Sequence, residues 1–307
     1  MKIFDLNQKC DLPIAISLGF FDCIHTGHKR LVERSIECAK TGENGAKYSA
    51  LLTFRNDPNA RFGKSPQIYT FEDRKSVLDA LQLDVLIGAM FDDDFVSLSP
   101  HDFLSILTEH FCVKVIVVGA DYTFGYRAQG NVSYLNAFCE EHGIKLVVEP
   151  FEEVNGKKLS TRNLKNLVLD GDVCTLNKLL SYPYFISGQV SHERHDGTKI
   201  GYPTANLLPN CERIALKDGI YATKIVVDGK IYNAMTNVGA KPTFNQNSPS
   251  VETHIFDFSG DIYGKDVKIL FFERTRDIIK FPSVEELKSQ LRRDEAQIRG
   301  ILSKIKF

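Results

Sequence analysis

The hydrophobic pattern of the chain changes near residue 183, and this change limits the possible folds more than any other feature of the sequence. Before it, short apolar runs alternate with helical patterns, and the runs lie at 14–18, 48–54, 84–88, 113–119 and 144–148. Strands that alternate with helices are typical of a parallel sheet with crossover helices. We therefore expect an α/β domain with a parallel sheet over residues 1–183.

After the change, turn signals replace the helical patterns. The apolar runs 224–227 and 230–235 flank Asp228-Gly229, a pair favoured in two-residue hairpins. Further strands are expected at 251–256 and 267–272. The pattern predicts an antiparallel sheet or small barrel.

A helix is expected to close the chain. Ser283 and Glu286 have the spacing of a capping box, which marks a helix start. Its buried side is expected to carry Leu287, Leu291 and Ile298. Residues 184–307 are thus expected to form an antiparallel β-barrel domain with a closing helix.

Composition supports two folded domains and narrows the possible partners. A chain of 307 residues is longer than one hydrophobic core usually supports. The net charge of −1 offers no positive field to hold nucleic acid or an anionic membrane, and the apolar runs are far shorter than the roughly 18 residues of a membrane span. The N-terminus lacks signal-peptide features and the seven cysteines include no C-x-x-C pair, which predicts a cytoplasmic protein with reduced thiols.

A segment rich in glycine and histidine follows the first expected strand and precedes a helical pattern. It reads Gly19-Phe20-Phe21-Asp22-Cys23-Ile24-His25-Thr26-Gly27-His28. Glycines allow close backbone approach and a helix N-terminus presents unpaired N–H groups, so the segment predicts a phosphate site. His25 and His28 are placed to stabilise the charge of a transferred phosphoryl group. The alternatives are a helix cap with two incidental histidines and a zinc site, whose further ligands are not apparent.

This segment resembles the H-x-G-H signature of nucleotidyltransferases, in the form found in bifunctional riboflavin kinase/FAD synthetases. Two later segments, 118–131 and 160–173, are similar to that family in the same order. The resemblance implies a Rossmann-like nucleotidyltransferase (FAD synthetase) domain in which His25 and His28 are catalytic. It also implies ATP binding by Gly19, Phe20, Phe21, Asp22, Gly27, Asp121, Phe124, Gly125, Arg127, Asn131, Ser160, Thr161 and Arg162.

Three residues depart from the pattern of that family. Cys23 stands where the family usually has glycine, Asp57 where it has histidine, and Leu164 where a phosphate-binding arginine is expected. A missing guanidinium removes a bidentate phosphate contact. The departures predict that the adenylylating activity is weaker than the kinase activity.

A second glycine-containing segment, 197–206, lies in the C-terminal part of the chain. Its glycines allow a tight loop around phosphates, and the side-chain oxygens of Thr204 and Asn206 suit Mg²⁺. A glycine–proline turn followed by a capping asparagine is the alternative. The segment resembles the P-T-A-N motif of riboflavin kinases. This resemblance implies metal binding by Thr204 and Asn206 and ATP binding by Gly188, Gly197, Gly201 and Pro203.

Two further segments are similar to riboflavin kinases, Asn237-Val238-Gly239 to N-x-G and Val251-Glu252-Thr253-His254 to V-E-x-H. The glutamate acts in that family as the base toward the riboflavin 5′-hydroxyl, so the resemblance implies this role for Glu252, with His254 as structural support. A carboxylate in an apolar strand is costly unless it is paired or functional, and a solvated outward face is the alternative. The resemblance also implies flavin binding by Arg276 and Phe281.

The expected function is flavin cofactor biosynthesis. Riboflavin and ATP would give FMN, and FMN and ATP would give FAD with release of pyrophosphate, both with Mg²⁺ as cofactor. One alternative is a riboflavin kinase or flavin-sensing regulatory protein with an inactive adenylyltransferase domain. Another is a transferase of the same superfamily that acts on a different phosphorylated substrate. The expected partners are riboflavin, FMN and ATP, with no nucleic acid and no membrane.

Overall fold

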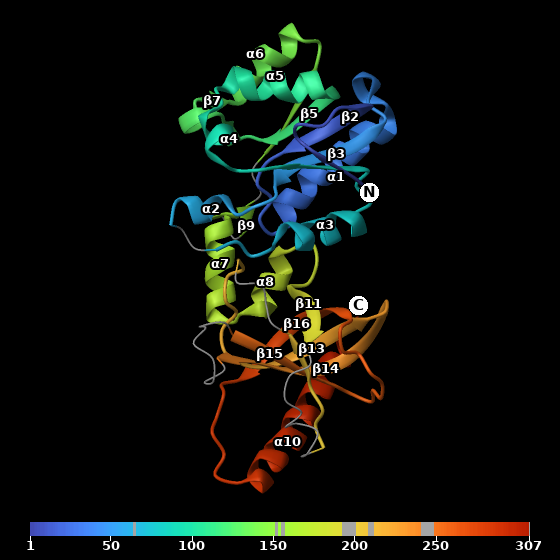
Figure 1. Cartoon of the computed structure of the whole chain (residues 1–307), viewed down its shortest axis with the longest axis vertical. Coiled ribbons are helices and arrows are strands. Elements are labelled where there is room, and N and C mark those ends of the chain that lie inside the picture. Colours follow the sequence, from blue (N-terminus) through green and yellow to red (C-terminus); the bar gives the residue numbers. More distant parts are fainter. Residues whose placement is uncertain are drawn as a thin grey trace. The chain divides into compact units, whose positions relative to one another are not determined.

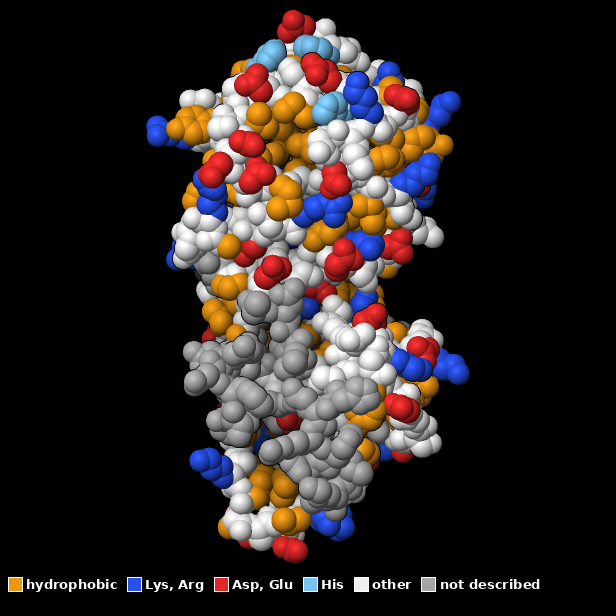
Figure 2. All heavy atoms as spheres, in the orientation of Figure 1, with side chains coloured by type: hydrophobic (Ala, Val, Ile, Leu, Met, Phe, Trp, Pro, Cys, Tyr) orange, Lys and Arg blue, Asp and Glu red, His pale blue; other side chains and the backbone are white. Residues whose placement is uncertain are grey.

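A computed structural model describes residues 1–63, 66–150, 153–154, 157–191, 201–207, 212–240 and 249–306. The chain divides into two compact units, Met1–Thr161 and Arg162–Phe307 (Figure 1). Side chains of both charges are interspersed over the face seen in Figure 2, in keeping with a net charge of −1. Within the described ranges, every helix is too short or too polar to cross a membrane.

The first unit is built on a parallel sheet of six strands in the order β1-β4-β3-β2-β5-β8. The strands are β1 (Lys2–Asp5), β2 (Cys10–Leu18), β3 (Tyr48–Phe54), β4 (Val85–Ala89), β5 (Phe111–Gly119) and β8 (Lys145–Glu149). The expected parallel α/β fold and its five strands are confirmed. Strand β1, an edge strand of four residues that pairs with β4, was not predicted.

Helices and short strand pairs complete this unit. The helices are α1 (Thr26–Thr41), α2 (Pro58–Arg61), α3 (Phe71–Ala80), α4 (Asp93–Ser97), α5 (Pro100–His110) and α6 (Val132–Glu141), with 3₁₀ turns η1 (Glu43–Gly45) and η2 (Tyr126–Ala128). The short pairs are β6 (Thr123–Phe124) with β7 (Gly130–Asn131) and β9 (Glu153–Val154) with β10 (Lys157–Lys158).

The central strand β2 is buried on both of its faces because helices cover the sheet on each side. Ile14 and Ile16 pack in a core with residues of α5 and α6. Ala15 packs on the other side with Cys38 of α1. Strands with two buried faces appear as continuous apolar runs, as β2 does. The chain runs from β2 through β3 to β4 and then returns to place β5 on the other side of β2. Parallel α/β folds commonly bind ligands at the carboxyl ends of strands where the order reverses in this way.

The second unit contains a closed antiparallel barrel with the strand order β11-β12-β15-β14-β13-β16. Its strands are β11 (Phe185–Ser191), β12 (Ala205–Leu207), β13 (Gly219–Val227), β14 (Lys230–Ala240), β15 (Pro249–Ile255) and β16 (Asp266–Arg276). The predicted hairpin is present: Asp228 and Gly229 have φ of 49° and 75° and join β13 to β14. Two successive positive φ values define the type I′ turn that this residue pair favours.

Two helices precede the barrel in this unit, α7 (Thr161–Asp170) and α8 (Val173–Leu179). Asn177 of α8 joins the barrel, because its Nδ2 donates to the Phe271 carbonyl at 2.8 Å and its Oδ1 accepts the Tyr184 N–H at 2.7 Å. The compact unit thus begins before the barrel, whereas the boundary expected between 183 and 184 lies next to the first barrel strand. That boundary stays a prediction.

The closing helix is α10 (Val284–Leu302), and it begins where the capping pattern predicts. The Ser283 side chain accepts the backbone N–H of Glu286 at 3.2 Å. Ile298 is fully buried, whereas Leu287 and Leu291 are only half-buried. These two leucines line a cavity between the helix and the barrel wall.

Candidate active sites

The loop between β2 and α1 holds its motif in a strained backbone conformation. Phe21 and Ile24 have φ of 53° and 45°, which bulky and β-branched residues rarely adopt. Neighbouring groups fix the loop: Ile68 N–H donates to the Asp22 carboxylate at 2.7 Å, and Thr53 Oγ1 donates to the Phe20 carbonyl at 2.5 Å. The motif is therefore held in place by the protein itself.

The two histidines of the motif lie at the first turn of α1. His25 is the N-cap, and its Nδ1 accepts the backbone N–H of His28 at 3.2 Å, so the proton of a neutral His25 ring is on Nε2. The rings are stacked with centroids 3.6 Å apart. Burial lowers the pKa of His25 to about 4. Burial, His25 and Arg74 lower the pKa of His28 well below its usual value. Both rings are therefore neutral at pH 7.

Two polar atoms in this turn have no partner among the described residues. Thr26 Oγ1 and His28 Nδ1 are buried and form no hydrogen bond. Unmatched buried polar atoms are costly, so they indicate a ligand or a water molecule. The helix-cap alternative is correct for His25, but capping alone leaves these two atoms unexplained.

A cavity of about 350 Å³ lies beside this turn, at the carboxyl ends of β2 and β5. It brings together most of the residues expected in the nucleotidyltransferase site: Gly19, Phe21, His25, Gly27, His28, Asp121, Ser160 and Thr161. Six further residues line it that were not predicted from the sequence: Leu18, Leu31, Gly119, Tyr122, Pro150 and Leu159. A helix N-terminus at a point where strand order reverses suits a phosphorylated ligand.

A second cavity of about 610 Å³ in the same unit is lined mainly by aromatic side chains. It shares Gly19, Asp121 and Tyr122 with the first cavity. The predicted residues Phe20, Phe124, Gly125 and Arg127 line it, together with Phe54, Phe62, Phe91, Phe95 and Phe103, which the sequence analysis missed. Gly125 is required there, because its φ is +72° and a Cβ atom would lie 2.7 Å from the backbone nitrogen of Pro100.

Three predicted ATP-binding residues lie outside the linings of these two cavities. Asp22 holds the loop through Ile68, as described above. Asn131 caps α6 by accepting the Tyr134 N–H at 2.9 Å. Arg162 is exposed on α7 in the second unit. Their ATP-binding role stays a prediction.

The three departures from the family pattern have structural positions. Cys23 is 1% exposed and Leu164 is fully buried. The Asp57 carboxylate accepts the backbone N–H groups of Asn59 and Gln67, each at 2.9 Å. None of the three belongs to the described lining of the first cavity. The lining of this cavity therefore does not support the expectation that these three residues weaken the adenylylating activity through lost phosphate contacts.

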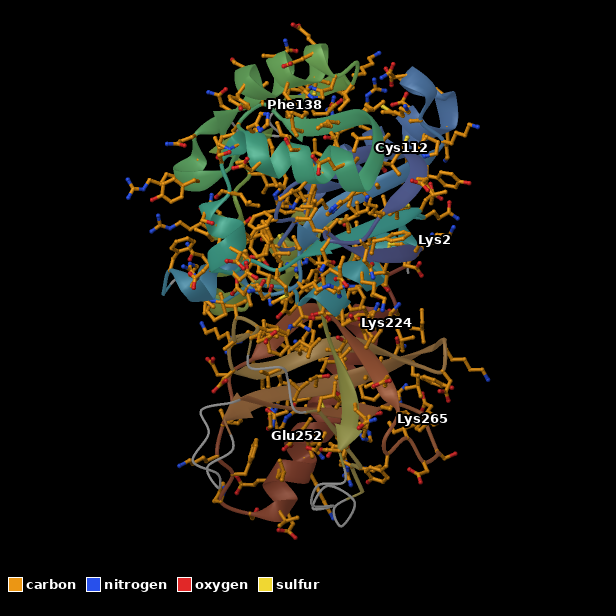
Figure 3. The ribbon with its side chains drawn as sticks, turned by 45° about the horizontal axis from the view of Figure 1, so that its top comes forward. Lys2, Cys112, Phe138, Lys224, Glu252 and Lys265 are labelled. Carbon is orange, nitrogen blue, oxygen red and sulfur yellow. The ribbon has the colours of Figure 1, made fainter. Side chains whose placement is uncertain are left out.

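In the second unit, Glu252 lies on the barrel (Figure 3), in a row of polar residues formed by strand pairing. Glu252 of β15 is opposite Asn206 of β12 and Asn237 of β14. Cross-strand partners project to the same face with Cβ atoms about 5 Å apart. Thr236 and Thr253 lie on the alternate face, where their hydroxyls are 2.9 Å apart.

This row borders a cavity of about 500 Å³ that is otherwise largely apolar. The predicted residues Thr204, Glu252, Arg276 and Phe281 all line it, and Asn206 is the buried neighbour of Glu252. His254, expected as structural support, and Leu287 and Leu291, expected on the buried side of the closing helix, also line it. The remaining lining residues were not predicted from the sequence: Tyr202, Ile220, Met235, Asn237, Ile278 and Ile279. The solvated outward face considered for Glu252 does not fit its place in this cavity.

Two side chains hold the edges of the cavity in place. His254 Nδ1 donates to the Pro203 carbonyl at 2.8 Å, so this histidine supports the segment that carries Thr204. Arg276 donates from Nε and Nη2 to the carboxylate of Asp294 at 3.0 and 2.6 Å, which ties the end of β16 to α10. Asp294 is 2% exposed. Its position three residues after Leu291 on the buried side of the helix is the sequence signal that could have identified it.

The remaining predicted residues of the second unit are spread more widely. Gly188 pairs with Val267 in the barrel, and Gly201 has φ of +84°, a value that favours glycine. Gly197 lies outside the described residues. Among the residues that the structure covers, no group of three His, Cys, Asp or Glu side chains could hold a metal ion.

Comparison with known proteins covers both units. The family model for FAD synthetase matches residues 7–163, and the family model for riboflavin kinase matches residues 180–302. The bifunctional riboflavin kinase/FMN adenylyltransferase of Bacillus subtilis is 33% identical over 92% of this chain and 90% of its own length. The enzyme of the same name from Haemophilus influenzae is 32% identical over 91% of each chain.

A solved structure shows the same fold in both units. The crystal structure of a protein from Streptococcus pneumoniae, named there a macrolide-efflux protein, is similar with a TM-score of 0.86 and 28% sequence identity. The similarity covers 97% of this chain and 99% of the other.

Proposed function

The chain belongs to the family of bifunctional riboflavin kinase/FMN adenylyltransferases, and we propose that the barrel unit makes FMN and the sheet unit converts it to FAD. The observation that carries this assignment is the contrast between the two sites. One has a carboxylate in an apolar cavity, and the other has a neutral histidine pair at a helix N-terminus. The substrates are riboflavin, FMN and ATP, and nothing in the comparisons favours a sensor with an inactive domain.

In the kinase step, Glu252 takes the proton of the riboflavin 5′-hydroxyl. The hydroxyl oxygen then forms a bond to the γ-phosphorus of ATP, and the bond from that phosphorus to the β-phosphate oxygen breaks, so that ADP leaves. Support comes from the position of Glu252 at the cavity and from the apolar lining, which suits a flavin ring. Arg276 helps to shape the flavin site by holding α10 through Asp294.

The donors near Glu252 fit Mg²⁺. Thr204 offers a hydroxyl and Asn206 an amide oxygen, both hard ligands of the kind that Mg²⁺ accepts while it keeps several waters. When bound, Mg²⁺ neutralises charge on the phosphates of ATP. Support comes from the pairing of Asn206 with Glu252 across β12 and β15, and from Thr204, which lines the same cavity as Glu252.

In the adenylyl step, a 5′-phosphate oxygen of FMN forms a bond to the α-phosphorus of ATP, and pyrophosphate leaves. This nucleophile is already an anion, so the step needs no strong base. His25 and His28 act as neutral donors: the Nε2–H of His25 and the backbone N–H groups of α1 stabilise the charge on the phosphate oxygens. The aromatic cavity beside the site suits the flavin ring of FMN.

We further propose that these reactions take place in the cytoplasm, where ATP is available. The test of the proposed function is product analysis. Purified protein is incubated with riboflavin, ATP and Mg²⁺, and the products are separated by chromatography. We expect FMN to form first and FAD to follow. Protein that converts neither riboflavin nor FMN would contradict the assignment, and FMN without FAD would contradict the role of the sheet unit.

A further inference from the structure

One buried side-chain oxygen at the barrel cavity accepts no hydrogen bond from the described residues. Oδ1 of Asn237 on β14 is buried and has no hydrogen-bond partner among the described residues. A buried acceptor without a donor is costly, and folded proteins pair nearly all such groups. A donor that is not part of the described protein is therefore expected at this position.

The strand neighbours of Asn237 cannot supply that donor. Its cross-strand partners are Glu252 on β15 and Ile220 on β13. An ionised carboxylate only accepts hydrogen bonds, and an isoleucine side chain neither donates nor accepts them. Thr236 is adjacent in sequence, but its hydroxyl lies on the alternate face of the strand, 2.9 Å from that of Thr253.

The cavity beside Asn237 has room for a ligand that brings a donor. Its volume is about 500 Å³, and the wall includes the apolar side chains of Ile220, Met235 and Phe281. Glu252 and Asn237 present two acceptors side by side on this wall. Phosphate groups at neutral pH are also mainly acceptors, so these side chains favour hydroxyl groups over the phosphates of a nucleotide. An apolar ring with a polyhydroxylated chain has the matching chemistry.

We propose that Asn237 Oδ1 accepts a hydrogen bond from a hydroxyl of the ribityl chain of riboflavin and so places the terminal hydroxyl beside Glu252. This inference rests on the proposed kinase function and adds a positioning residue to it. Asn237 takes no proton in the reaction. It binds and orients the chain, whereas Glu252 acts on the terminal hydroxyl.

The first test compares two flavins that differ only in their side chain. Binding of riboflavin and of lumiflavin, which has a methyl group in place of the ribityl chain, is measured by fluorescence with the full-length protein. We expect Asn237→Ala to raise the Kd of riboflavin about tenfold, because a buried hydrogen bond is lost, and to change the Kd of lumiflavin less than about twofold. Asn233→Ala is the matched control, since Asn233 is exposed on the same strand, and it should change neither.

The second test uses the kinetics of FMN formation. Asn237→Ala should raise the KM of riboflavin about tenfold, as it raises the Kd, and should change the KM of ATP less than about twofold. A merely structural role would raise both KM values.

Two outcomes would overturn the inference alone: wild-type affinity of Asn237→Ala for riboflavin, or equal weakening of riboflavin and lumiflavin binding. An equal rise in the KM of riboflavin and of ATP in Asn237→Ala would overturn it as well. These results are distinct from a failure of the proposed function, in which the wild-type protein itself would form no FMN from riboflavin. That failure would remove the premise and the inference with it.

Discussion

The two cavities differ in the charge of the side chains that line them, and this difference matches the nucleophiles that we propose for the two steps. The barrel site has a carboxylate, Glu252, between two asparagine side chains. The sheet site has His25 and His28, which are neutral at pH 7 and stand at a helix N-terminus. A hydroxyl must lose its proton to attack, so it needs a base. A phosphate is already an anion, so it needs hydrogen-bond donors for the charge that develops.

Replacing the proposed base should give the largest effect. Glu252→Gln keeps the size of the side chain but cannot accept a proton, so FMN formation should fall about 100-fold to 10,000-fold. FAD formation from supplied FMN should stay at the wild-type rate. Initial rates with each substrate provide the measurement. A loss of less than about tenfold in FMN formation would show that Glu252 only positions the substrate.

Replacing His28 should reduce FAD formation and spare FMN formation, the opposite of the effect expected for Glu252→Gln. We expect His28→Ala to reduce FAD formation from FMN about 100-fold to 1,000-fold, the usual cost of removing a preorganised donor. FMN formation should be unchanged. His101→Ala is the matched control, because the His101 side chain is 67% exposed and does not line either cavity of the sheet unit. Equal losses in both activities would contradict the separation of the sites.

Leu164, the buried residue at the position where the family has arginine, tests whether α7 contacts phosphate in the sheet site. Leu164→Arg restores the residue type expected from the family, but Leu164 is fully buried in α7. An unpaired buried charge should lower the free energy of unfolding by about 3 kcal/mol, and FAD formation should not rise. Leu169→Arg on the same helix is the control, since Leu169 is 49% exposed. Chemical denaturation compares the two variants, and a gain in FAD formation by Leu164→Arg would show that this position does contact phosphate.

The pKa of His25 makes stability depend on pH. Its pKa is about 4 in the folded protein and about 6.5 in an unfolded chain, so the unfolded state takes up a proton first as pH falls. Stability is complete above pH 6.5 and is lost between 6.5 and 4, by on the order of 2 kcal/mol at pH 5. His25→Asn keeps a capping side chain without this titration. Denaturation at pH 7 and pH 5 should show a smaller loss in the variant, and identical losses would refute the assignment.

Much of the fold could be predicted because its patterns are local. The strands of the sheet, the Asp228-Gly229 hairpin and the start of α10 at Ser283 follow from residues close in sequence. Strand β1 was missed because four residues are too few to show a period. The roles of Asp22 and Asp57 could not be predicted either. Each carboxylate accepts hydrogen bonds from backbone N–H groups that are distant in the sequence.

The sites could be predicted only in part, for a similar reason. Motifs near a strand end, such as the one with His25 and His28, indicate their own cavity. The aromatic cavity is assembled from separate loops and helices, and its phenylalanines look like ordinary core residues in the sequence. Asn237 faces Glu252 only through strand register, which no local pattern reveals.

Complementation tests the central claim, that two separate sites perform the two steps, most directly. Glu252→Gln and His28→Ala proteins are incubated with riboflavin, ATP and Mg²⁺, each alone and then together, and FAD is measured by chromatography. Each variant alone should form little FAD, because one step is blocked. The mixture should form FAD at least about tenfold faster than either variant, since FMN made by one protein is used by the other. A mixture no more active than its components would contradict two independent sites.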